Sequence, residues 1–310
     1  MTLQQLKYSI TVAETGSISE AARRLFISQP SLTSAIQELE KEMGIRIFNR
    51  TNKGVIVSHE GDVFLSYARQ VLEQVGLLEE RFLTAKERRP HFSDSCQHYS
   101  FAVNAFVDVI QEFDARQYDF TLRETQTYEI IEDVTRLKSE IGILYVSSKN
   151  EEVILKLIKQ NGLQFQELFE AKPHVFISLK HPLAKRKALT LKELEDYPYL
   201  SFEQGEYNSF YFAEEILSTL DRRKNIKVRD RATLFNLVIG LNGYTVSSGV
   251  ISRQLNGENI IARPLLVEEY MKIGTITQKN MPLSRYGRAY MEALGRHCRL
   301  EEAWDWREKK

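Results

Sequence analysis

Cysteine is scarce in this chain of 310 residues, and neither sign of charge is in excess. The two cysteines, Cys96 and Cys298, lie far apart in the sequence, so they form no pair with metal-ligand spacing. We expect both to be reduced thiols, with a redox-sensitive disulfide between them as the alternative. The 42 Lys and Arg residues balance 42 Asp and Glu residues, which argues against a broadly basic nucleic-acid coat protein. A local basic patch can still bind nucleic acid.

The chain also lacks the segments and motifs of several other protein classes. Its first residues show no basic stretch followed by an apolar one, and no apolar run approaches the roughly 20 residues that span a bilayer. We therefore expect a cytoplasmic protein without a membrane partner. There is no Gly-x-Ser-x-Gly elbow, no Walker loop and no His-Glu-x-x-His, and the six histidines show no ligand spacing. The sequence thus predicts no enzyme, with neither catalytic residues nor a metal site.

Three zones divide the sequence. Residues 1–58 hold short helical patterns followed by two strand-like runs, and residues 59–89 form one unbroken segment that ends in a charged run before Pro90. From 90 to 300, strand-like and helical runs alternate, and a charged tail, 301–310, follows. This alternation predicts an α/β arrangement with parallel sheets. Because the length exceeds that of one typical core, we expect two domains, the second of them divided.

Within the third zone, the run 101–106 has the composition of a strand but continues with helical spacing through Phe113, so we expect a helix to start there. Residues 211–220 and 284–296 are also expected to be helical. Residues 141–146 are expected to form a strand that closes the first half of this zone.

Two short helices with a tight break between them are predicted in the first zone. The first follows Gly16-Ser17, which can cap a helix, and its Ala21-Ala22 pair allows a second helix to approach closely. The second begins at Ser28, with Pro30 in its first turn. Its buried face is expected at spacings of 4, 3 and 4 residues: Leu32, Ile36, Leu39 and Met43.

The first turn and outer face of this second helix are small and polar, and comprise Ser28, Gln29, Pro30, Ser31, Thr33, Ser34 and Gln37. Such a face suits the major groove of DNA, because Gln can form a bidentate pair with adenine while Ser and Thr can bond bases or phosphates. The helix N-terminus also favours a nearby phosphate. The alternative is an ordinary amphipathic helix whose outer face is only solvated.

Residues 44–57 predict a hairpin of two short strands joined by an Asn-Lys-Gly turn. Directly after a recognition helix, such a hairpin would be a wing, and Arg50 and Lys53 would reach backbone phosphates or the adjacent minor groove. Residues 1–58 carry seven Lys and Arg against five Asp and Glu, a balance of only +2. The alternative is a surface hairpin with solvated basic residues.

The first 65 residues resemble the N-terminal signature of LysR-type transcriptional regulators, without gaps over most of that length. The matching landmarks are Ala13-Glu14, Gly16-Ser17, Ala21-Ala22, Leu25, Ser28-Gln29-Pro30, Leu39-Glu40, Gly44, Phe48, Arg50 and Gly61. The resemblance implies a winged helix-turn-helix domain at 1–58. It also implies that these positions face DNA: Gln29, Pro30, Ser31, Thr33, Ser34 and Arg50. Many members of the family carry a basic residue where this chain has Ser34, a departure that bears on base preference at that contact.

The second zone, 59–89, predicts a long linker helix that mediates dimerisation. Apolar residues repeat there with a mean period near 3.5: Phe64, Ala68, Val71, Val75, Leu78 and Phe82. A helix of about 27 residues would be about 40 Å long and would pair with the same helix of a second copy. The alternative is packing against the chain's own second domain.

A two-fold dimer would place two recognition helices in successive major grooves, which selects an interrupted inverted repeat in double-stranded DNA. The family resemblance adds that such dimers commonly assemble as tetramers and bend the DNA between two sites. RNA polymerase is a further candidate partner.

The third zone, 90–300, resembles the regulatory domain of the same family, which is similar to type 2 periplasmic solute-binding proteins with two α/β lobes. The resemblance implies lobe I at about 91–163 and 266–300, and lobe II at about 164–265. A small-molecule effector is expected between them, because strand carboxyl ends and helix N-termini face such a cleft. The candidate contacts are Cys96, Gln97, His98, Thr125, Gln126, Thr127, Ser201, Phe202, Thr245 and Ser247.

Hydroxyl, amide and backbone N–H groups at these positions favour a polar or anionic effector, and no other cofactor is expected. The family often has Ser or Thr where this chain has Cys96, a departure that argues against sulfate-like ligation there. For each loop, the alternative is a turn without ligand contact. The sequence therefore predicts a DNA-binding transcriptional regulator controlled by a small molecule. A ligand-binding or assembly protein without specific DNA readout is the alternative.

Overall fold

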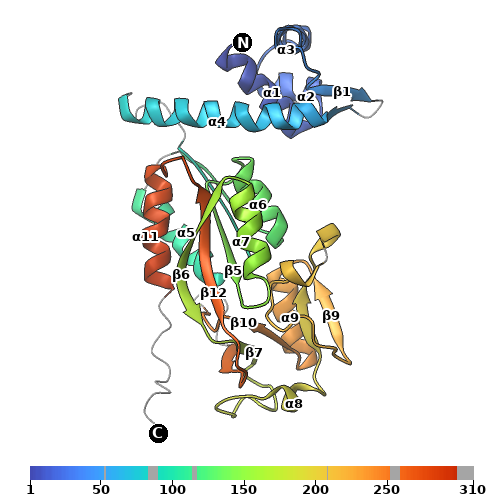
Figure 1. Ribbon diagram of the computed structural model, residues 1–310, viewed down its shortest axis with the longest axis vertical. Coiled ribbons are helices and arrows are strands. Elements are labelled where there is room, and N and C mark those ends of the chain that lie inside the picture. Colours follow the sequence, from blue (N-terminus) through green and yellow to red (C-terminus); the bar gives the residue numbers. More distant parts are fainter. Residues whose placement is uncertain (52–53, 83–89, 114–116, 208, 252–258, 299–310) are drawn as a thin grey trace. The chain divides into compact units, whose positions relative to one another are not determined.

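The computed structural model describes residues 1–51, 54–82, 90–113, 117–207, 209–251 and 259–298 (Figure 1). The chain divides into two compact units, Met1–Arg88 and Arg89–Lys310, each with its own apolar core. No helix in the described ranges is both long and apolar enough to cross a membrane. The predictions for Lys53, for the tail 301–310 and for the side chains of Arg50 and Phe82 lie outside what is described.

Local capping signals set the ends of the first three helices, of which the sequence predicts the second and third. They are α1 (Leu3–Thr15), α2 (Ile18–Arg24) and α3 (Gln29–Met43). Ser17 caps α2, because its hydroxyl accepts the Glu20 N–H, and Ser28 caps α3 by accepting the Ser31 N–H at 3.2 Å. Gly44 ends α3 in the left-handed conformation, with φ of 67°.

The apolar face predicted for α3 is confirmed over most of its length. Leu32, Ile36 and Leu39 are buried against the Ala21-Ala22 pair of α2 and against α1. Met43 is instead 41 % exposed, so the prediction is wrong for this residue. It lies in the last turn before Gly44, at the edge of the core.

The predicted hairpin is confirmed as β1 (Phe48–Thr51) paired antiparallel with β2 (Gly54–Val57). Its position is fixed by a backbone contact, because Val55 N–H donates to the carbonyl of Gly16 at 2.9 Å. Gly54 has φ of +135°, and a Cβ there would lie 2.4 Å from the same carbonyl oxygen. Only glycine fits this close approach, so the hairpin is held against the turn between α1 and α2.

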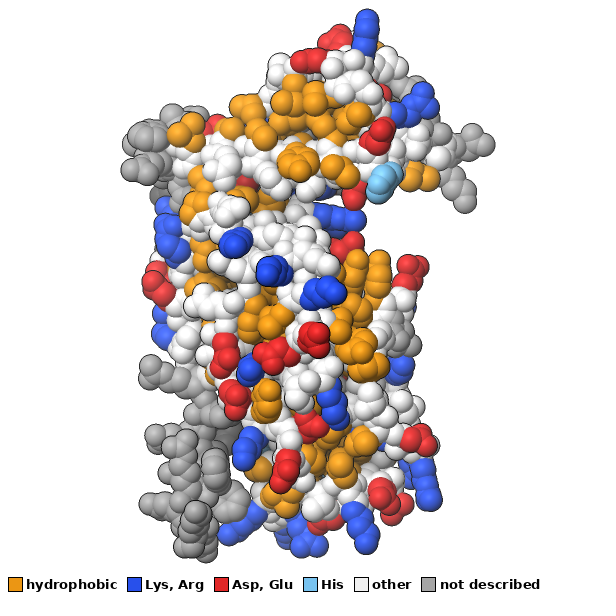
Figure 2. Space-filling model, viewed as in Figure 1, with side chains coloured by type: hydrophobic (Ala, Val, Ile, Leu, Met, Phe, Trp, Pro, Cys, Tyr) orange, Lys and Arg blue, Asp and Glu red, His pale blue; other side chains and the backbone are white. Residues whose placement is uncertain are grey.

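The long predicted helix is α4 (His59–Phe82), but its apolar face is divided between two environments. Phe64 and Ala68 are buried in the core of their own unit, beneath α1. The prediction that they form a dimer seam is therefore wrong, because side chains already covered cannot meet a second copy. Hydrophobic side chains also lie exposed along the surface over α4 (Figure 2): Val63 at 50 %, Tyr67 at 65 %, Val71 at 40 % and Leu78 at 59 % exposure.

Lobe I of the second unit is a sheet of five described strands in the order β4-β3-β5-β12-β6. The strands are β3 (His91–Cys96), β4 (Asp119–Glu124), β5 (Ile141–Val146), β6 (Leu163–Ala171) and β12 (Met271–Gln278). Helices cover both faces of this sheet (Figure 1), because its apolar residues alternate between two clusters. One cluster includes α5 (Ser100–Phe113) and α11 (Arg285–His297), and the other includes α6 (Thr127–Thr135) and α7 (Glu151–Gln160).

Lobe II is a second sheet of five described strands in the order β11-β7-β10-β8-β9. The strands are β7 (His174–Ser178), β8 (Tyr199–Phe202), β9 (Asn225–Val228), β10 (Tyr244–Ser247) and β11 (Ile260–Pro264). Helix α9 (Arg231–Leu241) packs against this sheet, and α8 (Leu191–Leu194) follows β7 in the chain. One apolar cluster contains residues of both lobes, such as Tyr145 and Tyr244.

Three predictions about this unit are corrected, two of them by the pairing of its strands. Both sheets are mixed rather than parallel, since β12 runs antiparallel to β5 and β6, and β7 runs antiparallel to β10 and β11. The predicted start of lobe II near 164 is wrong, because β6 pairs with β12 and the chain crosses only after Ala171. The helix predicted over 211–220 is also wrong: only a short 3-10 turn, Phe210–Phe212, forms there. The helix predicted from 101 is confirmed as α5.

A buried carboxyl group lies in the core of lobe I. Asp94 of β3 is fully buried, and its Oδ2 lies 3.0 Å from the hydroxyl of Tyr290 on α11. Its Oδ1 makes no hydrogen bond with any described residue. Burial raises the pKa of Asp94 to about 8, against the opposing effect of hydrogen bonds from Tyr290 and Cys96.

The stability of the protein should therefore depend on pH through Asp94. Between about pH 4, where an unfolded Asp ionises, and pH 8, folding retains a proton that the unfolded chain has released. This group lowers the free energy of unfolding by about 1.4 kcal/mol for each pH unit of rise. Asp94→Asn removes that dependence. We therefore expect the free energy of unfolding of the variant, measured in urea, to rise relative to that of the wild type between pH 5 and pH 8.

The matched control is Asp119→Asn, at an exposed position on the neighbouring strand β4. Its stability difference from the wild type should stay constant over the same range. A difference between Asp94→Asn and the wild type that does not change with pH would contradict the raised pKa.

Candidate functional sites

The outer face of α3 is polar and open. Of the residues predicted to face DNA there, Thr33 is half-buried, and the others are exposed: Ser28, Gln29, Pro30, Ser31, Ser34 and Gln37. Gln29 lies in the first turn, where Ser19 of α2 donates a hydrogen bond to its Oε1 at 3.0 Å. The Nε2 group of Gln29 has no partner among the described residues, so this amide is oriented by α2 and still has N–H groups to donate.

Glu40 connects α3 to the hairpin. Its Oε1 accepts the backbone N–H groups of Ile47 at 2.7 Å and Phe48 at 2.9 Å. A carboxylate that binds two backbone donors fixes the start of β1 relative to the helix. Together with the contact between Gly16 and Val55, this makes the helix face and the wing one rigid surface.

A small cavity of about 30 Å³ lies between the two lobes of the second unit, with room for a water molecule or two. Four of the predicted effector contacts line it: His98, Phe202, Thr245 and Ser247. The imidazole of His98 stacks on the ring of Phe202, with centroids 3.7 Å apart. In the described ranges, no group of His, Cys, Asp and Glu is arranged to hold a metal ion.

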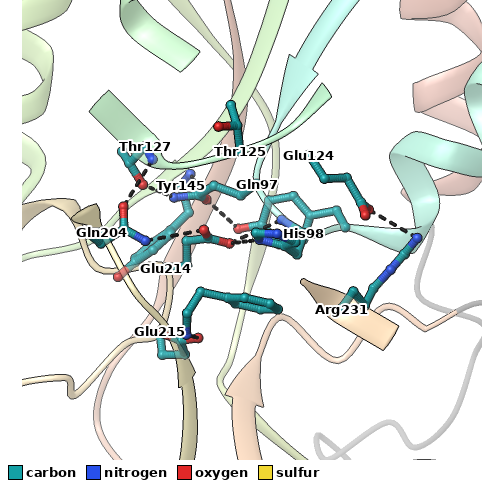
Figure 3. A network of polar contacts seen from close by, with 12 residues as sticks. Gln97, His98, Glu124, Thr125, Thr127, Tyr145, Gln204, Glu214, Glu215 and Arg231 are labelled. Carbon is teal, nitrogen blue, oxygen red and sulfur yellow. Dashed lines mark hydrogen bonds and ion pairs between the residues drawn. The ribbon is translucent and has the colours of Figure 1, made fainter. Parts of the chain in front are cut away.

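Polar contacts across the cavity connect lobe I to lobe II (Figure 3). His98 is bound twice by Glu214 Oε2, through its Nδ1 at 2.8 Å and its backbone N–H at 3.1 Å. Arg231, at the start of α9, pairs with Glu124, at the end of β4, at 3.1 Å. The lobes are therefore joined by two ion pairs from different elements.

Gln204 of lobe II adds neutral bonds to this network. Its Oε1 accepts the Thr127 N–H at 3.1 Å, and its Nε2 donates to Glu214 Oε1 at 3.3 Å. Gln126, once its amide is oriented to satisfy both neighbours, donates to the Gln204 carbonyl and accepts the Gly205 N–H, each at 3.3 Å. Two predicted effector contacts, Gln126 and Thr127, thus hold the lobes together.

Gln97 is buried behind this network, and its side chain is used by the protein itself. It donates to Thr127 Oγ1 at 2.6 Å and accepts from the Tyr99 hydroxyl at 3.0 Å and the Tyr145 N–H at 3.1 Å. The amide orients the residues around the cavity rather than lining it.

Three predicted effector contacts lie elsewhere. Cys96 is fully buried in the core, and burial raises the pKa of its thiol well above the usual value. Ser201 is buried within β8 and does not line the cavity, because alternate residues of a strand point to opposite faces. Thr125 contacts Glu129 of its own helix turn. None of these three residues lines the cavity as it is formed here, so their contact with an effector stays a prediction.

Sequence reasoning missed both carboxyl groups that line this site. Glu214 and Glu215 line the cavity and are buried, yet they lie where a helix is predicted. The available signal was a pair of adjacent acids inside the apolar run 210–217. Arg231 and an apolar group also line the cavity; the apolar group comprises Tyr99, Phe176, Leu234, Phe235 and Val246.

The charge state of His98 follows from its surroundings. Burial disfavours the imidazolium, but the negative charge of Glu214 and the hydrogen bond to it outweigh burial, so the pKa of His98 is raised. A raised pKa means that this contact stabilises the folded state fully below about pH 6.5, the ordinary value for His. The stabilisation is lost as the pH rises through the folded-state pKa.

Breaking the contact between His98 and Glu214 should lower stability most while both side chains are charged. Both side chains are nearly inaccessible, at 4 % and 5 % exposure. We expect His98→Gln and Glu214→Gln each to lower the free energy of unfolding by roughly 3–5 kcal/mol at pH 6, and by less at pH 9. The double variant should cost less than the two single changes added together.

Unfolding by urea at both pH values measures these differences. His91→Gln, at an exposed position on β3, is the control and should change little at either pH. Equal costs for the single variants at pH 6 and pH 9 would contradict a charged contact between the lobes.

Comparison with known proteins agrees with this arrangement. Residues 3–62 match the family described as bacterial regulatory helix-turn-helix proteins of the lysR family, and residues 98–299 match the LysR substrate binding domain. The transcriptional regulator AlsR of Bacillus subtilis is 26 % identical over 257 residues, covering 81 % of this chain and 78 % of AlsR. YnfL of Escherichia coli, an uncharacterised helix-turn-helix regulator, is 31 % identical over 227 residues, 71 % of each chain.

Among solved structures, a full-length OxyR variant of Pseudomonas aeruginosa superimposes with a TM-score of 0.66 at 19 % identity. The alignment covers 96 % of this chain and 94 % of that one, which supports the fold. The two family matches cover both the helix-turn-helix and most of the two-lobed unit. The chain therefore belongs to the LysR family of helix-turn-helix transcriptional regulators.

Proposed function

We propose that this regulator reads duplex DNA through the first turn and outer face of α3, and that a small molecule between its two lobes controls it. The observation that carries the DNA-reading surface is Gln29, an exposed amide held by Ser19 with its N–H groups unused by the described protein. An amide in this state can pair with the N7 and N6 groups of adenine. No catalytic step is part of this proposal, and its place of action is the cytoplasm.

The neighbouring groups have different roles in DNA binding. Ser28 and Ser31 share a hydrogen bond of 2.7 Å at the N-terminus of α3, where exposed backbone N–H groups favour a phosphate. Thr33, Ser34 and Gln37 face the groove further along the helix. Arg50 and Lys53 of the wing would contact phosphates or the minor groove. Phosphate contacts orient the helix and base contacts supply specificity.

Dimerisation is the second part of the proposal. The exposed apolar side chains of α4 lie at spacings that place them along one side of the helix: Val63, Tyr67, Val71 and Leu78. A second copy of α4 would remove them from water and give the assembly a two-fold axis, so that two α3 helices meet an interrupted inverted repeat. Two such dimers on neighbouring sites would form a tetramer that bends DNA, with RNA polymerase as a further partner.

Control by a ligand requires that it favour one arrangement of the lobes over another. The cavity adjoins the bonds that join lobe I to lobe II, so a molecule bound there would replace or rearrange those bonds. A change in lobe spacing would alter the packing of copies and hence the spacing of the DNA-binding units.

The DNA-reading role of α3 predicts the effect of one substitution. Gln29→Ala should weaken binding to the specific site by roughly 1–3 kcal/mol and leave binding to unrelated DNA unchanged. Both are measured by fluorescence anisotropy at fixed salt, because affinity depends on salt. Gln4→Ala, an exposed glutamine of α1, is the control. An unchanged ratio of specific to nonspecific affinity would favour an assembly protein without DNA readout.

The dimer proposal predicts the effect of charge on α4. Tyr67→Glu together with Leu78→Glu places two carboxylates on its exposed apolar face, and burying an unpaired charge is unfavourable. We expect light scattering to show a monomer where the wild type is a dimer or tetramer. Leu266→Glu, at an exposed position in the second unit, should leave the mass unchanged. A variant of α4 that keeps the wild-type mass would show that another surface joins the copies.

A further inference from the structure

The cavity between the lobes contains two adjacent buried carboxylates that differ in their pairing. Glu214 is bound to His98. Glu215, 3 % exposed, accepts the Phe202 N–H at 2.8 Å. Among the described residues, no Lys, Arg or His comes within ion-pair distance of Glu215. An acid without a cation lines a cavity where every other charged group already has a partner.

Arg231 is the group that would suit an anion, but it is already engaged. Its Nη2 forms an ion pair with Glu124 at 3.1 Å, and its buried Nη1 has no hydrogen-bond partner among the described residues. Burial favours the protonated, neutral form of Glu215, and the other two carboxylates at the cavity, Glu124 and Glu214, balance Arg231 and the imidazolium of His98. Ionisation of Glu215 would add one negative charge to receive a cation, and a neutral oxygen satisfies the free N–H of Arg231 without changing that charge.

A second group in the lining also lacks a partner. Thr245 is 4 % exposed and lines the cavity, yet its hydroxyl makes no hydrogen bond with any described residue. This oxygen is therefore available to accept a bond from a donor in the cavity. The aromatic rings of the lining, which include Phe176, Phe202 and Phe235, present faces that attract cations.

We propose that the small molecule bound between the lobes carries a protonated amine, received by Glu215 and the hydroxyl of Thr245, with a neutral oxygen for Arg231. This inference rests on the proposed function, in which the cavity binds the effector. It differs from the polar or anionic effector expected from the sequence, because Glu214 and Glu215 were not foreseen at the site.

The ionisation of Glu215 makes the proposal measurable as a change in the number of bound protons. Burial raises the pKa of Glu215 well above the ordinary value, and the charge of Glu214 adds to this, while backbone hydrogen bonds and Arg222 act in the opposite direction. A cation beside this carboxyl stabilises its charged form. Binding of an amine should therefore release a proton from this carboxyl, whereas an anion bound at the same place should release none.

A second, smaller cavity also includes Glu215 in its lining. Lys149 lines it as well, but its ammonium is paired with Glu269 at 3.1 Å. The two cavities have volumes of about 30 Å³ and about 10 Å³, so any amine larger than a water molecule or two must part the lobes. Such a ligand would couple binding to the contacts between them.

The test compares amines with acids of matched length on the full chain by isothermal titration calorimetry. Ethanolamine is paired with glycolate, and putrescine with succinate. We expect heat of binding for at least one amine and none for its matched acid. Titration in buffers of different ionisation enthalpy should show proton release. Glu215→Gln should weaken the amine at least tenfold, and Glu206→Gln, at an exposed position in the same segment, should leave it unchanged.

Each other outcome overturns the inference. Binding of the acids alone, or binding of neither class, would show that the site does not select an amine. Amine binding without proton release would show the same for the wild type, whether or not Glu215→Gln folds. The proposed function is tested separately by specific DNA binding of the wild type. If the protein binds its specific DNA and also binds the acids, the proposed amine ligand is wrong and the proposed function as a DNA-binding regulator stands.

Discussion

The carboxylate of Glu214 is bound by groups of both lobes at their junction. It binds the imidazole and backbone of His98 from lobe I and the amide of Gln204 from lobe II. Because a buried charge is stable only when it is paired and hydrogen-bonded, these three groups must keep their positions together. The stacking of His98 on Phe202 then fixes one wall of the cavity, and Gln204 carries the same constraint to Thr127.

The first unit could be predicted almost completely from the sequence, because its signals are local. Ser17, Ser28 and Gly44 act on neighbouring backbone groups, and the polar face of α3 follows from helical spacing alone. The resemblance to the LysR family then gave these residues a role. The misassigned residues are those whose environment is set from a distance: Phe64 has the right spacing for a coiled coil but packs beneath α1.

The second unit shows where such reasoning ends. Both candidate loops after β3 and β4 lie at the junction of the lobes, as strand order predicts. The pairing of β6 with β12 joins segments more than a hundred residues apart, and no local pattern specifies it. Glu214 and Glu215 lie in a segment with helical spacing, so only the tertiary fold shows that they are buried. Their charge is what changes the expected chemistry of the ligand.

The close contact of Gly16 with Gly54 has a consequence for regulation. The wing is fixed by backbone contact to the turn between α1 and α2, and by Glu40 to α3. Each DNA-binding unit therefore presents one fixed surface to the groove. In the described part of this unit, these two contacts hold the wing in place against a signal from elsewhere in the chain. Under the proposed function, such a signal would instead adjust the distance and tilt between the DNA-binding units of two copies, and the regulated quantity would be the geometry of the pair rather than the affinity of one unit.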